Sequence, residues 1–132
     1  MKNCLLLLLL ASICCSCAPT TQDIYGKSCT ALTEKQIKRL IIKSRLAMKN
    51  NVKKGVVSAA EAAFAERNEP NVDIRYRGDR YGTAFITWRT RTRVIGLRFD
   101  NELDADIPSC SLAISTVPDA VSILPDKSIK GR

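Results

Sequence analysis

The hydrophobic and polar positions of this chain fall into three successive patterns. The first is an unbroken apolar run from Leu5 to Leu10. Between Ile37 and Phe64 apolar residues recur every three or four positions, and from Val72 to Ile114 they alternate with polar residues. Helical spacing buries one stripe of a helix, whereas alternation buries one face of a strand. The sequence therefore predicts an apolar leader, a helical segment and a sheet, in that order.

Two helices are predicted within the helical segment. Thr33-Glu34-Lys35-Gln36 has the form of a capping box, so the first helix is expected to begin at Glu34 and run to about Lys49. Ser58-Ala59-Ala60-Glu61 repeats this form, and Pro70 should end the second helix near Asn68. The apolar stripe expected to pack against the sheet is Ile37, Leu40, Ile41, Ala47 and Met48, widened by Ile42 and Leu46.

The first helix also carries many basic residues beside its apolar stripe, most of them lysines. A helix of this composition can bury its apolar side in the protein core, or it can lie on an anionic bilayer. We expect burial, because a small domain needs this helix for its core. Binding at a membrane surface is the alternative.

The alternating segment predicts an antiparallel meander of three or four strands. The residues expected to face the helices are Val72, Ile74, Tyr76, Ala84, Ile86, Trp88, Ile95, Leu97, Phe99, Cys110, Leu112 and Ile114. Short connections such as residues 78–82 favour antiparallel neighbours. The predicted fold class is α+β, with two helices packed on the sheet. The predicted organisation is a leader (1–16), an N-terminal tether (17–30), the α+β domain (31–117) and a loose tail (118–132).

The leader has the layout of an export signal. Lys2 supplies a positive charge, and the apolar core of about ten residues is far shorter than the roughly twenty that a membrane-spanning helix needs. Its end, Ser16-Cys17, resembles the signals of bacterial lipoproteins, in which the cysteine carries acyl chains such as palmitate. The resemblance implies lipidation at Cys17.

Other outcomes for the leader remain open. Cys14 and Cys15 are alternative acceptors, and an ordinary secretory signal cut near Cys17-Ala18 is a second possibility. In the lipoprotein family the residue after the modified cysteine influences sorting. Here it is Ala18 and not Asp, which by resemblance favours the periplasmic face of the outer membrane.

Two cysteines remain beyond the leader, Cys29 and Cys110. An exported protein meets an oxidising compartment, so we expect a disulfide bond between them. It would close a loop of about eighty residues, for which the chain-entropy estimate is roughly 4 to 5 kcal/mol. Two buried thiols, or two cysteines too distant to bond, are the alternatives.

The net charge of the 132-residue chain is +8. Such a balance favours anionic partners, and in an exported protein these are lipid headgroups, cell-wall polymers or acidic protein faces in preference to nucleic acid. The chain has no histidine, so Ser109 and Ser111 lack a histidine base and no enzyme activity is expected. No cofactor or metal is expected either, because the acidic run from Asp100 to Asp106 lacks the glycine and terminal glutamate of a calcium loop.

The candidate binding residues are arginines and aromatic residues of the sheet. They are Arg75, Arg77, Arg80, Arg89, Arg91, Arg93, Arg98, Tyr76 and Trp88. Guanidinium groups bind carboxylates and phosphates in forked pairs, so an exposed arginine face suits an anionic partner. A solvated face that keeps the protein soluble is the plainer interpretation. Arg77-Gly78-Asp79 also matches an integrin-type tripeptide, although Gly-Asp is ordinary turn chemistry.

The order helix, helix, meander in a small lipoprotein resembles the BamE/SmpA family of outer-membrane assembly lipoproteins. Thr33-Glu34-Lys35-Gln36-Ile37 is similar to that family's helix start, and the segment from Ile95 to Asn101 is similar to its late strand and turn. The resemblance implies a role as an accessory in a membrane complex. We expect a non-enzymatic envelope lipoprotein that binds another envelope component through its basic sheet face. An inhibitor or effector that blocks an enzyme or host target is the alternative.

Overall fold

The computed structural model describes residues 18–116, so the leader, Cys17 and the predicted tail lie outside the described residues. Within the described residues, two helices and six strands follow one another. They are β1 (Thr20–Gln22), β2 (Ser28–Thr30), α1 (Glu34–Val52), α2 (Ala59–Arg67), β3 (Asn71–Gly78), β4 (Tyr81–Arg89), β5 (Arg93–Glu102) and β6 (Ser109–Thr116). Among these residues, no helix is long and apolar enough to cross a membrane.

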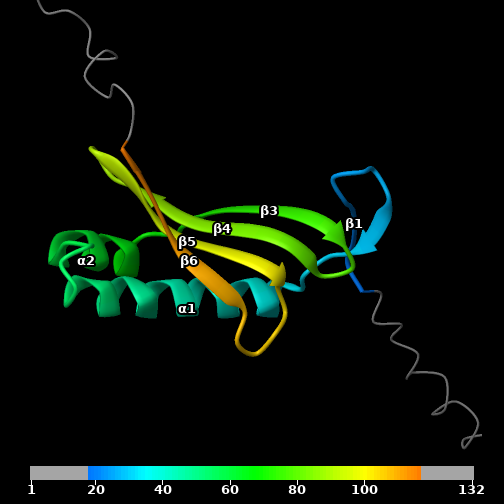
Figure 1. Ribbon diagram of the computed structural model, residues 1–132, viewed down its shortest axis with the longest axis horizontal. Helices are drawn as coiled ribbons and strands as arrows, with labels where there is room; N and C mark the ends of the chain where they lie inside the picture. Colours follow the sequence, from blue (N-terminus) through cyan, green and yellow to red (C-terminus); the bar gives the residue numbers. More distant parts are fainter. Residues whose placement is uncertain (1–17, 117–132) are drawn as a thin grey trace, which may run out of the picture.

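The four longer strands form one antiparallel sheet in the order β3-β4-β5-β6. Helix α1 runs along one face of this sheet, α2 lies beside one end of α1, and the short strands lie toward the other end (Figure 1). The predicted fold class, two helices on an antiparallel meander, is confirmed. The sheet thus has an inner face toward the helices and an outer face away from them.

The alternation of the sequence correctly predicts the buried residues of β4 and β5, whereas Val72, Leu112 and Ile114 on the two edge strands are exposed by 36% to 37%. Ala84, Ile86 and Trp88 of β4 are almost fully buried, and so are their neighbours on β5. Antiparallel register places Ile86 opposite Leu97 and Trp88 opposite Ile95. Directly opposed residues lie on the same face of a sheet, so these pairs form one continuous core layer.

Both helices begin with the predicted capping boxes. The Thr33 hydroxyl accepts a hydrogen bond from the Gln36 N–H while the Gln36 side chain accepts one from the Thr33 N–H, and Ser58 and Glu61 do the same for α2. Each box satisfies donors that the first helical turn leaves unpaired.

The buried stripe of α1 is narrower than the sequence predicts. Leu40 and Met48 are buried, but Ile42 and Leu46 have exposed fractions of 65% and 58%. Between the two buried residues lies Ser44, whose hydroxyl donates to the Leu40 carbonyl oxygen at 2.9 Å. The centre of the stripe therefore lies at Leu40, Ser44 and Met48, and Ile42 and Leu46 face away from the sheet.

Part of the segment expected to be an irregular tether is structured. Strands β1 and β2 form an antiparallel hairpin, and the Ile24 N–H in its turn donates to the Tyr76 carbonyl oxygen of β3 at 2.9 Å. The Asp23 carboxylate accepts from the N–H groups of Tyr25 and Lys27 and so closes this turn. The hairpin covers one end of the β3 edge of the sheet.

Candidate functional site

The outer face of the sheet carries the densest group of exposed arginines. Residues 75 and 77 of β3 and residue 98 of β5 alternate with core positions, so their side chains point away from the helices. We call this surface the outer sheet face and define it by Asp73, Arg75, Arg77, Thr83, Phe85, Thr87, Val94, Arg98, Asp100 and Ala113.

Phe85 of β4 stands between two of these arginines. The guanidinium carbons of Arg75 and Arg98 lie 6.0 and 5.9 Å from the centre of its ring. Arg98 is the direct cross-strand partner of Phe85, and Arg75 is a diagonal neighbour on the other adjoining strand. A cation over an aromatic face is attracted by the ring quadrupole. The ring therefore holds both guanidinium groups close together on the outer sheet face.

Two aspartates orient the same guanidinium groups. Arg75 donates from Nε and Nη2 to Asp73 Oδ2 at 3.3 and 3.1 Å, and Arg98 donates from Nε and Nη2 to Asp100 Oδ1 at 3.1 and 3.0 Å. Burial of the Asp100 carboxylate acts to raise its pKa. The hydrogen bonds from Arg98 and Thr83 and the charge of Arg77 outweigh burial, so the pKa of Asp100 lies below its ordinary value. Asp100 thus stays charged and keeps Arg98 in place.

Arg77 has no carboxylate partner within residues 18–116. Its Nη2 donates to Thr83 Oγ1 at 3.0 Å, and that hydroxyl donates in turn to Asp100 Oδ1 at 3.0 Å. The three arginines therefore outnumber the two aspartates of the outer sheet face, and the face keeps an excess of positive charge.

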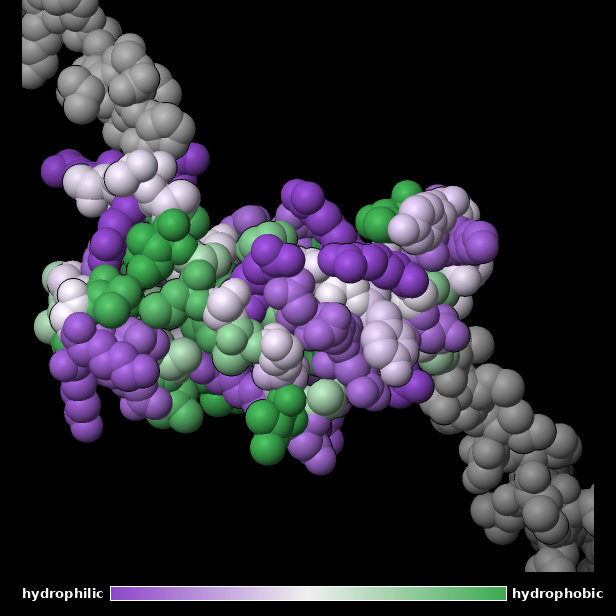
Figure 2. Space-filling view, viewed as in Figure 1, coloured by the Kyte–Doolittle hydropathy of each residue, from purple (hydrophilic) through white to green (hydrophobic). Residues whose placement is uncertain are grey.

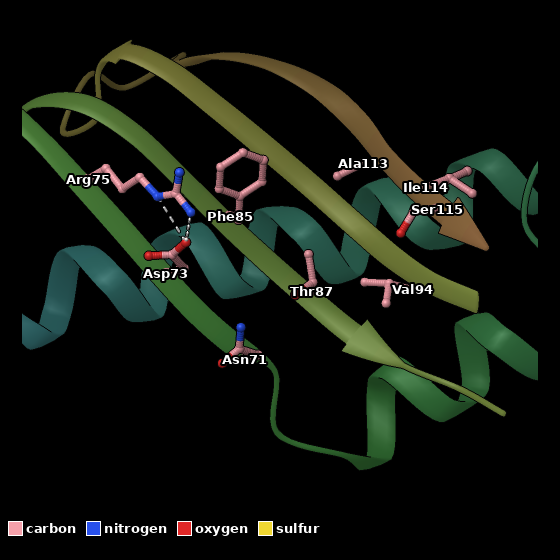
Figure 3. A pocket seen from close by; sticks show the side chains of 9 residues that line it. All are labelled: Asn71, Asp73, Arg75, Phe85, Thr87, Val94, Ala113, Ile114 and Ser115. Carbon is pink, nitrogen blue, oxygen red and sulfur yellow. Dashed lines mark hydrogen bonds and ion pairs between the residues drawn. The ribbon is translucent and has the colours of Figure 1, made fainter. Parts of the chain in front are cut away.

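Two hollows lie on the outer sheet face and share Arg75 and Phe85. The first has a volume of about 410 Å³ and extends from Arg75 toward Val94 and Ser115 (Figure 3). The second, about 390 Å³, lies between the arginines and Ile24 of the β1–β2 turn.

In Figure 2 hydrophobic residues gather toward the α2 end of the molecule, and hydrophilic residues dominate the opposite half.

Gly96 lies between two residues that line the first hollow. Thr87 and Ala113 are its cross-strand partners on β4 and β6. A Cβ atom on Gly96 would lie 2.1 Å from the Ile86 carbonyl oxygen, so β4 and β5 approach each other too closely for any larger residue. The glycine therefore allows the close approach of β4 and β5 beside the hollow.

Two of the expected binding residues lie in the core instead. Tyr76 and Trp88 have exposed fractions of 8% and 1% and point toward the helices. The Tyr76 hydroxyl accepts from the Leu32 N–H at 2.8 Å, and the Trp88 Nε1–H donates to the Asn68 carbonyl oxygen at 2.9 Å. Their polar atoms thus anchor the segments before α1 and after α2, and the assignment of both residues to a binding surface was wrong.

Two of the expected arginines are also used by the fold. Arg93 lies on the inner face and holds Glu61 of α2, with Nε–Oε1 and Nη2–Oε2 distances of 2.5 and 2.7 Å. The hydrogen bond from Arg93 lowers the pKa of Glu61 to about 2. Arg80 bonds Asp104 at 2.8 Å across the sheet end.

The remaining predicted positions lie at the two ends of the sheet. Arg89 and Arg91 are exposed near the β4–β5 turn and line neither hollow. Asp79 of the Arg-Gly-Asp tripeptide accepts a hydrogen bond from the Thr30 N–H at 2.6 Å, so its carboxylate closes the contact between the hairpin and the sheet. Residues 18–116 contain no cluster of side chains able to hold a metal ion.

The expected disulfide bond is absent. Both cysteines are free thiols; Cys29 is buried under the hairpin and Cys110 is exposed on β6. Burial raises the pKa of the Cys29 thiol, with a further contribution from the charges of Asp23 and Asp79. Cys29 lies near the β3 side of the sheet and Cys110 lies on the opposite edge strand. A disulfide needs Cα atoms within about 7 Å, whereas three strand spacings amount to roughly 14 Å.

Cross-strand register is what brings the site residues together. Alternation alone places Phe85 on the outer face, but only pairing of β3, β4 and β5 puts it between Arg75 and Arg98. Asp73 and Asp100 each lie two positions from the arginine that they hold, a spacing that marks one face of a strand.

Comparison of the chain with protein-family models, curated proteins and solved structures found no match.

Proposed function

We propose that this protein is a lipid-anchored accessory or scaffold of the cell envelope that binds an acidic partner through its outer sheet face. The single observation that carries the proposal is the stack of Arg75, Phe85 and Arg98 between two hollows. The leader and the resemblance to lipoprotein signals support export and an anchor at Cys17, with the periplasmic face of the outer membrane favoured.

The guanidinium groups of the stack retain donors for a partner. A guanidinium has five N–H donors, and Arg75 and Arg98 each use two nitrogens on a neighbouring aspartate. The unused donors face outward and suit a carboxylate, which accepts forked hydrogen bonds. Because the aspartates and the Phe85 ring already fix both side chains, little conformational entropy is lost when a partner binds.

The hollows favour a protein partner over a polymer of uniform charge. Each hollow contains apolar residues close to the arginines. These residues are Val94 and Ala113 in the first hollow and Ile24 in the second. An acidic segment whose apolar side chains enter the hollows would match both features. Arginine and aromatic side chains together are typical of protein interfaces.

The test is capture of partners by chemical crosslinking from membranes that contain the full chain. The double variant Arg75→Gln/Arg98→Gln should lose most of the captured partner, because both forks are removed while the core is untouched. Arg89→Gln/Arg91→Gln is the matched control, since it removes the same charge from exposed positions outside the hollows. Equal capture by wild type and the Arg75/Arg98 variant would refute the proposed face.

Lipidation separates this proposal from the inhibitor alternative. Cys17→Ser should release a scaffold from membranes and abolish its function, whereas an inhibitor could still block its target in soluble form. The measurement is membrane fractionation combined with mass analysis of the N-terminal peptide. Retained acylation in this variant would move the anchor to Cys14 or Cys15.

A further inference from the structure

The side of α1 that faces away from the sheet joins exposed aliphatic residues to lysines. Ile42 and Leu46 lie one turn apart and are exposed by 65% and 58%. Lys38 lies one turn before Ile42, and Lys35 and Lys49 lie two turns to either side of it, so all of them share one face of the helix. Lys53, the C-cap residue, continues the row.

A third aliphatic residue lies on the flank of this row. Ile107 of the β5–β6 loop has an exposed fraction of 92%. The loop passes beside α1 (Figure 1), where Ile107 borders a hollow between α1 and β5, and the neighbouring Asp106 fixes it there. The Asp106 carbonyl oxygen accepts from Lys43, and its carboxylate lies 3.7 Å from Arg39.

The positive charge of this surface is only weakly compensated. Lys38 pairs with Glu34 at 2.7 Å and Lys49 with Glu66 at 3.2 Å, and all four side chains are about half exposed or more. Exposed ion pairs of this kind are weak and exchange readily with other anions. Lys35 and Lys53 make no ion pair within the part of the chain that the structure describes.

We infer that this surface, which we call the lysine face, lies on an anionic lipid bilayer. Aliphatic tips that protrude among lysines can enter the headgroup region while the ammonium groups contact lipid phosphates. Ile42, Leu46 and Ile107 would be the inserted residues, and Lys35, Lys38, Lys49 and Lys53 the contacts to lipid. The inference is independent of the proposed partner of the outer sheet face, which points to the opposite side.

Lipid fits this surface better than a protein partner does. Lysine is depleted in protein interfaces because its long stem loses much rotamer freedom when fixed in one geometry. A fluid headgroup layer requires no fixed geometry, so flexible ammonium groups lose less freedom on it. The hollow of about 270 Å³ beside Ile107 includes neither Ile42 nor Leu46, so it does not extend along the lysine row.

The test uses the full chain bound to two kinds of vesicle, phosphatidylcholine alone and phosphatidylcholine mixed with phosphatidylglycerol. The acyl chains proposed at Cys17 attach the lipidated chain to both, so that only the contact of the domain differs. Lysines are acetylated briefly and quantified by mass spectrometry, with Lys27 of the exposed hairpin turn as the internal reference. We expect acetylation of Lys35, Lys38, Lys49 and Lys53 relative to Lys27 to fall several-fold on the anionic vesicles. Equal ratios on both vesicles would overturn the inference.

Three variants sharpen this measurement. Ile42→Ser/Leu46→Ser should remove most of the protection, whereas Tyr81→Ser, at an exposed position on the other side of the molecule, should keep it. Full protection in the Ile42/Leu46 variant would overturn the role of the inserted residues. Arg75→Gln/Arg98→Gln should leave the protection unchanged, so failure of the proposed function and failure of this inference are distinguishable.

A photo-crosslinking residue at position 46 distinguishes lipid from protein in producing cells. Position 46 points outward and makes no contact that the fold requires, so the replacement is expected to fold. A lipid adduct supports the lysine face as a bilayer contact. A protein adduct at this position would overturn it and assign α1 to a protein partner.

Discussion

The outer sheet face and the lysine face are both basic, but they carry their charge on different side chains in different settings. On the sheet, Arg75 and Arg98 are fixed by an aromatic ring and by aspartates. On α1, lysines surround Ile42 and Leu46 and form only exposed ion pairs. The first arrangement suits recognition of one shape, and the second suits attraction to a surface of no fixed shape.

This difference shows how little a net charge says by itself. The +8 of the chain combines guanidinium groups held by aspartates, exposed ammonium groups and arginines such as Arg93 that serve the fold. Only the first two kinds are available to partners.

The largest effect is expected from the two aromatic residues of β4, which belong to opposite faces of the sheet. Trp88→Ala should lower the free energy of unfolding by about 3 to 5 kcal/mol, because a fully buried side chain and its hydrogen bond to Asn68 are lost. Phe85→Ala should cost about 1 kcal/mol, since the ring is partly exposed, and should reduce partner capture. Chemical denaturation measures both. A similar loss of stability in the two variants would contradict the assignment of faces.

Gly96 tests the close approach of β4 and β5. Gly96→Ala should destabilise the protein by about 1 to 3 kcal/mol, because the new Cβ would collide with the Ile86 carbonyl oxygen. Ala113→Ser, on the strand next to Gly96, is the matched control and should change the free energy of unfolding by less than about 0.5 kcal/mol. A stable Gly96→Ala protein would mean that β4 and β5 lie farther apart than the structure shows.

Glu61 tests the arginine that serves the fold. Glu61→Gln keeps a side chain able to complete the capping box but loses the charge that Arg93 holds, and should cost about 1 to 2 kcal/mol. Glu66→Gln, which affects an exposed pair on the same helix, should cost less than about 0.5 kcal/mol. Thermal or chemical denaturation distinguishes the two.

The same carboxylate predicts a dependence on pH. The pKa of Glu61 is about 2 in the folded protein, and about 4.3 is usual for an unfolded chain. A carboxylate whose pKa is depressed by folding stabilises the fold when the pH is above the pKa of the unfolded chain. This contribution is lost as the pH falls from about 4 toward 2. The stability difference between wild type and Glu61→Gln should therefore shrink over this interval. A constant difference would indicate that Arg93 does not hold the carboxylate.

The fold could be predicted from the sequence because its signals are local. The Thr33–Gln36 and Ser58–Glu61 segments mark both helix starts, and a period of two marks the strands. The face of α1 was harder to predict, since Ile42 and Leu46 lie beside the apolar stripe and only packing on the sheet shows that it passes through Ser44. The β1–β2 hairpin is short and depends on its contact with Tyr76, which lies far away in the sequence.

The candidate site could be predicted only in part. Alternation places Arg75 and Arg98 outward, but it equally places Tyr76, Trp88 and Arg93 inward, so their assignment to a binding surface conflicted with the same pattern. The predicted disulfide bond between Cys29 and Cys110 was wrong because the number of cysteines in a sequence says nothing about the distance between them in the fold. Cross-strand register brings Phe85 between the arginines, and alternation within one strand does not determine it. The β3–β4 pairing even contains a register shift between Tyr76 and Gly78.

The smallest effects are expected from exchanges that keep the charge, and these separate the two faces most directly. Arg75→Lys/Arg98→Lys should weaken partner capture several-fold while the net charge is unchanged, because an ammonium group cannot offer the forked donors of a guanidinium. Lys38→Arg/Lys49→Arg on the lysine face should leave the protection of Lys35 and Lys53 on anionic vesicles unchanged, since a bilayer responds to charge and not to donor geometry. Partner capture and lysine acetylation are both measured on the wild type, on each double variant and on the protein that combines the two double variants. If neither exchange changes capture or protection, charge alone governs both faces and the fixed arginines confer no specificity. If the lysine exchange changes the protection on anionic vesicles, α1 contacts a shaped partner and not a lipid surface.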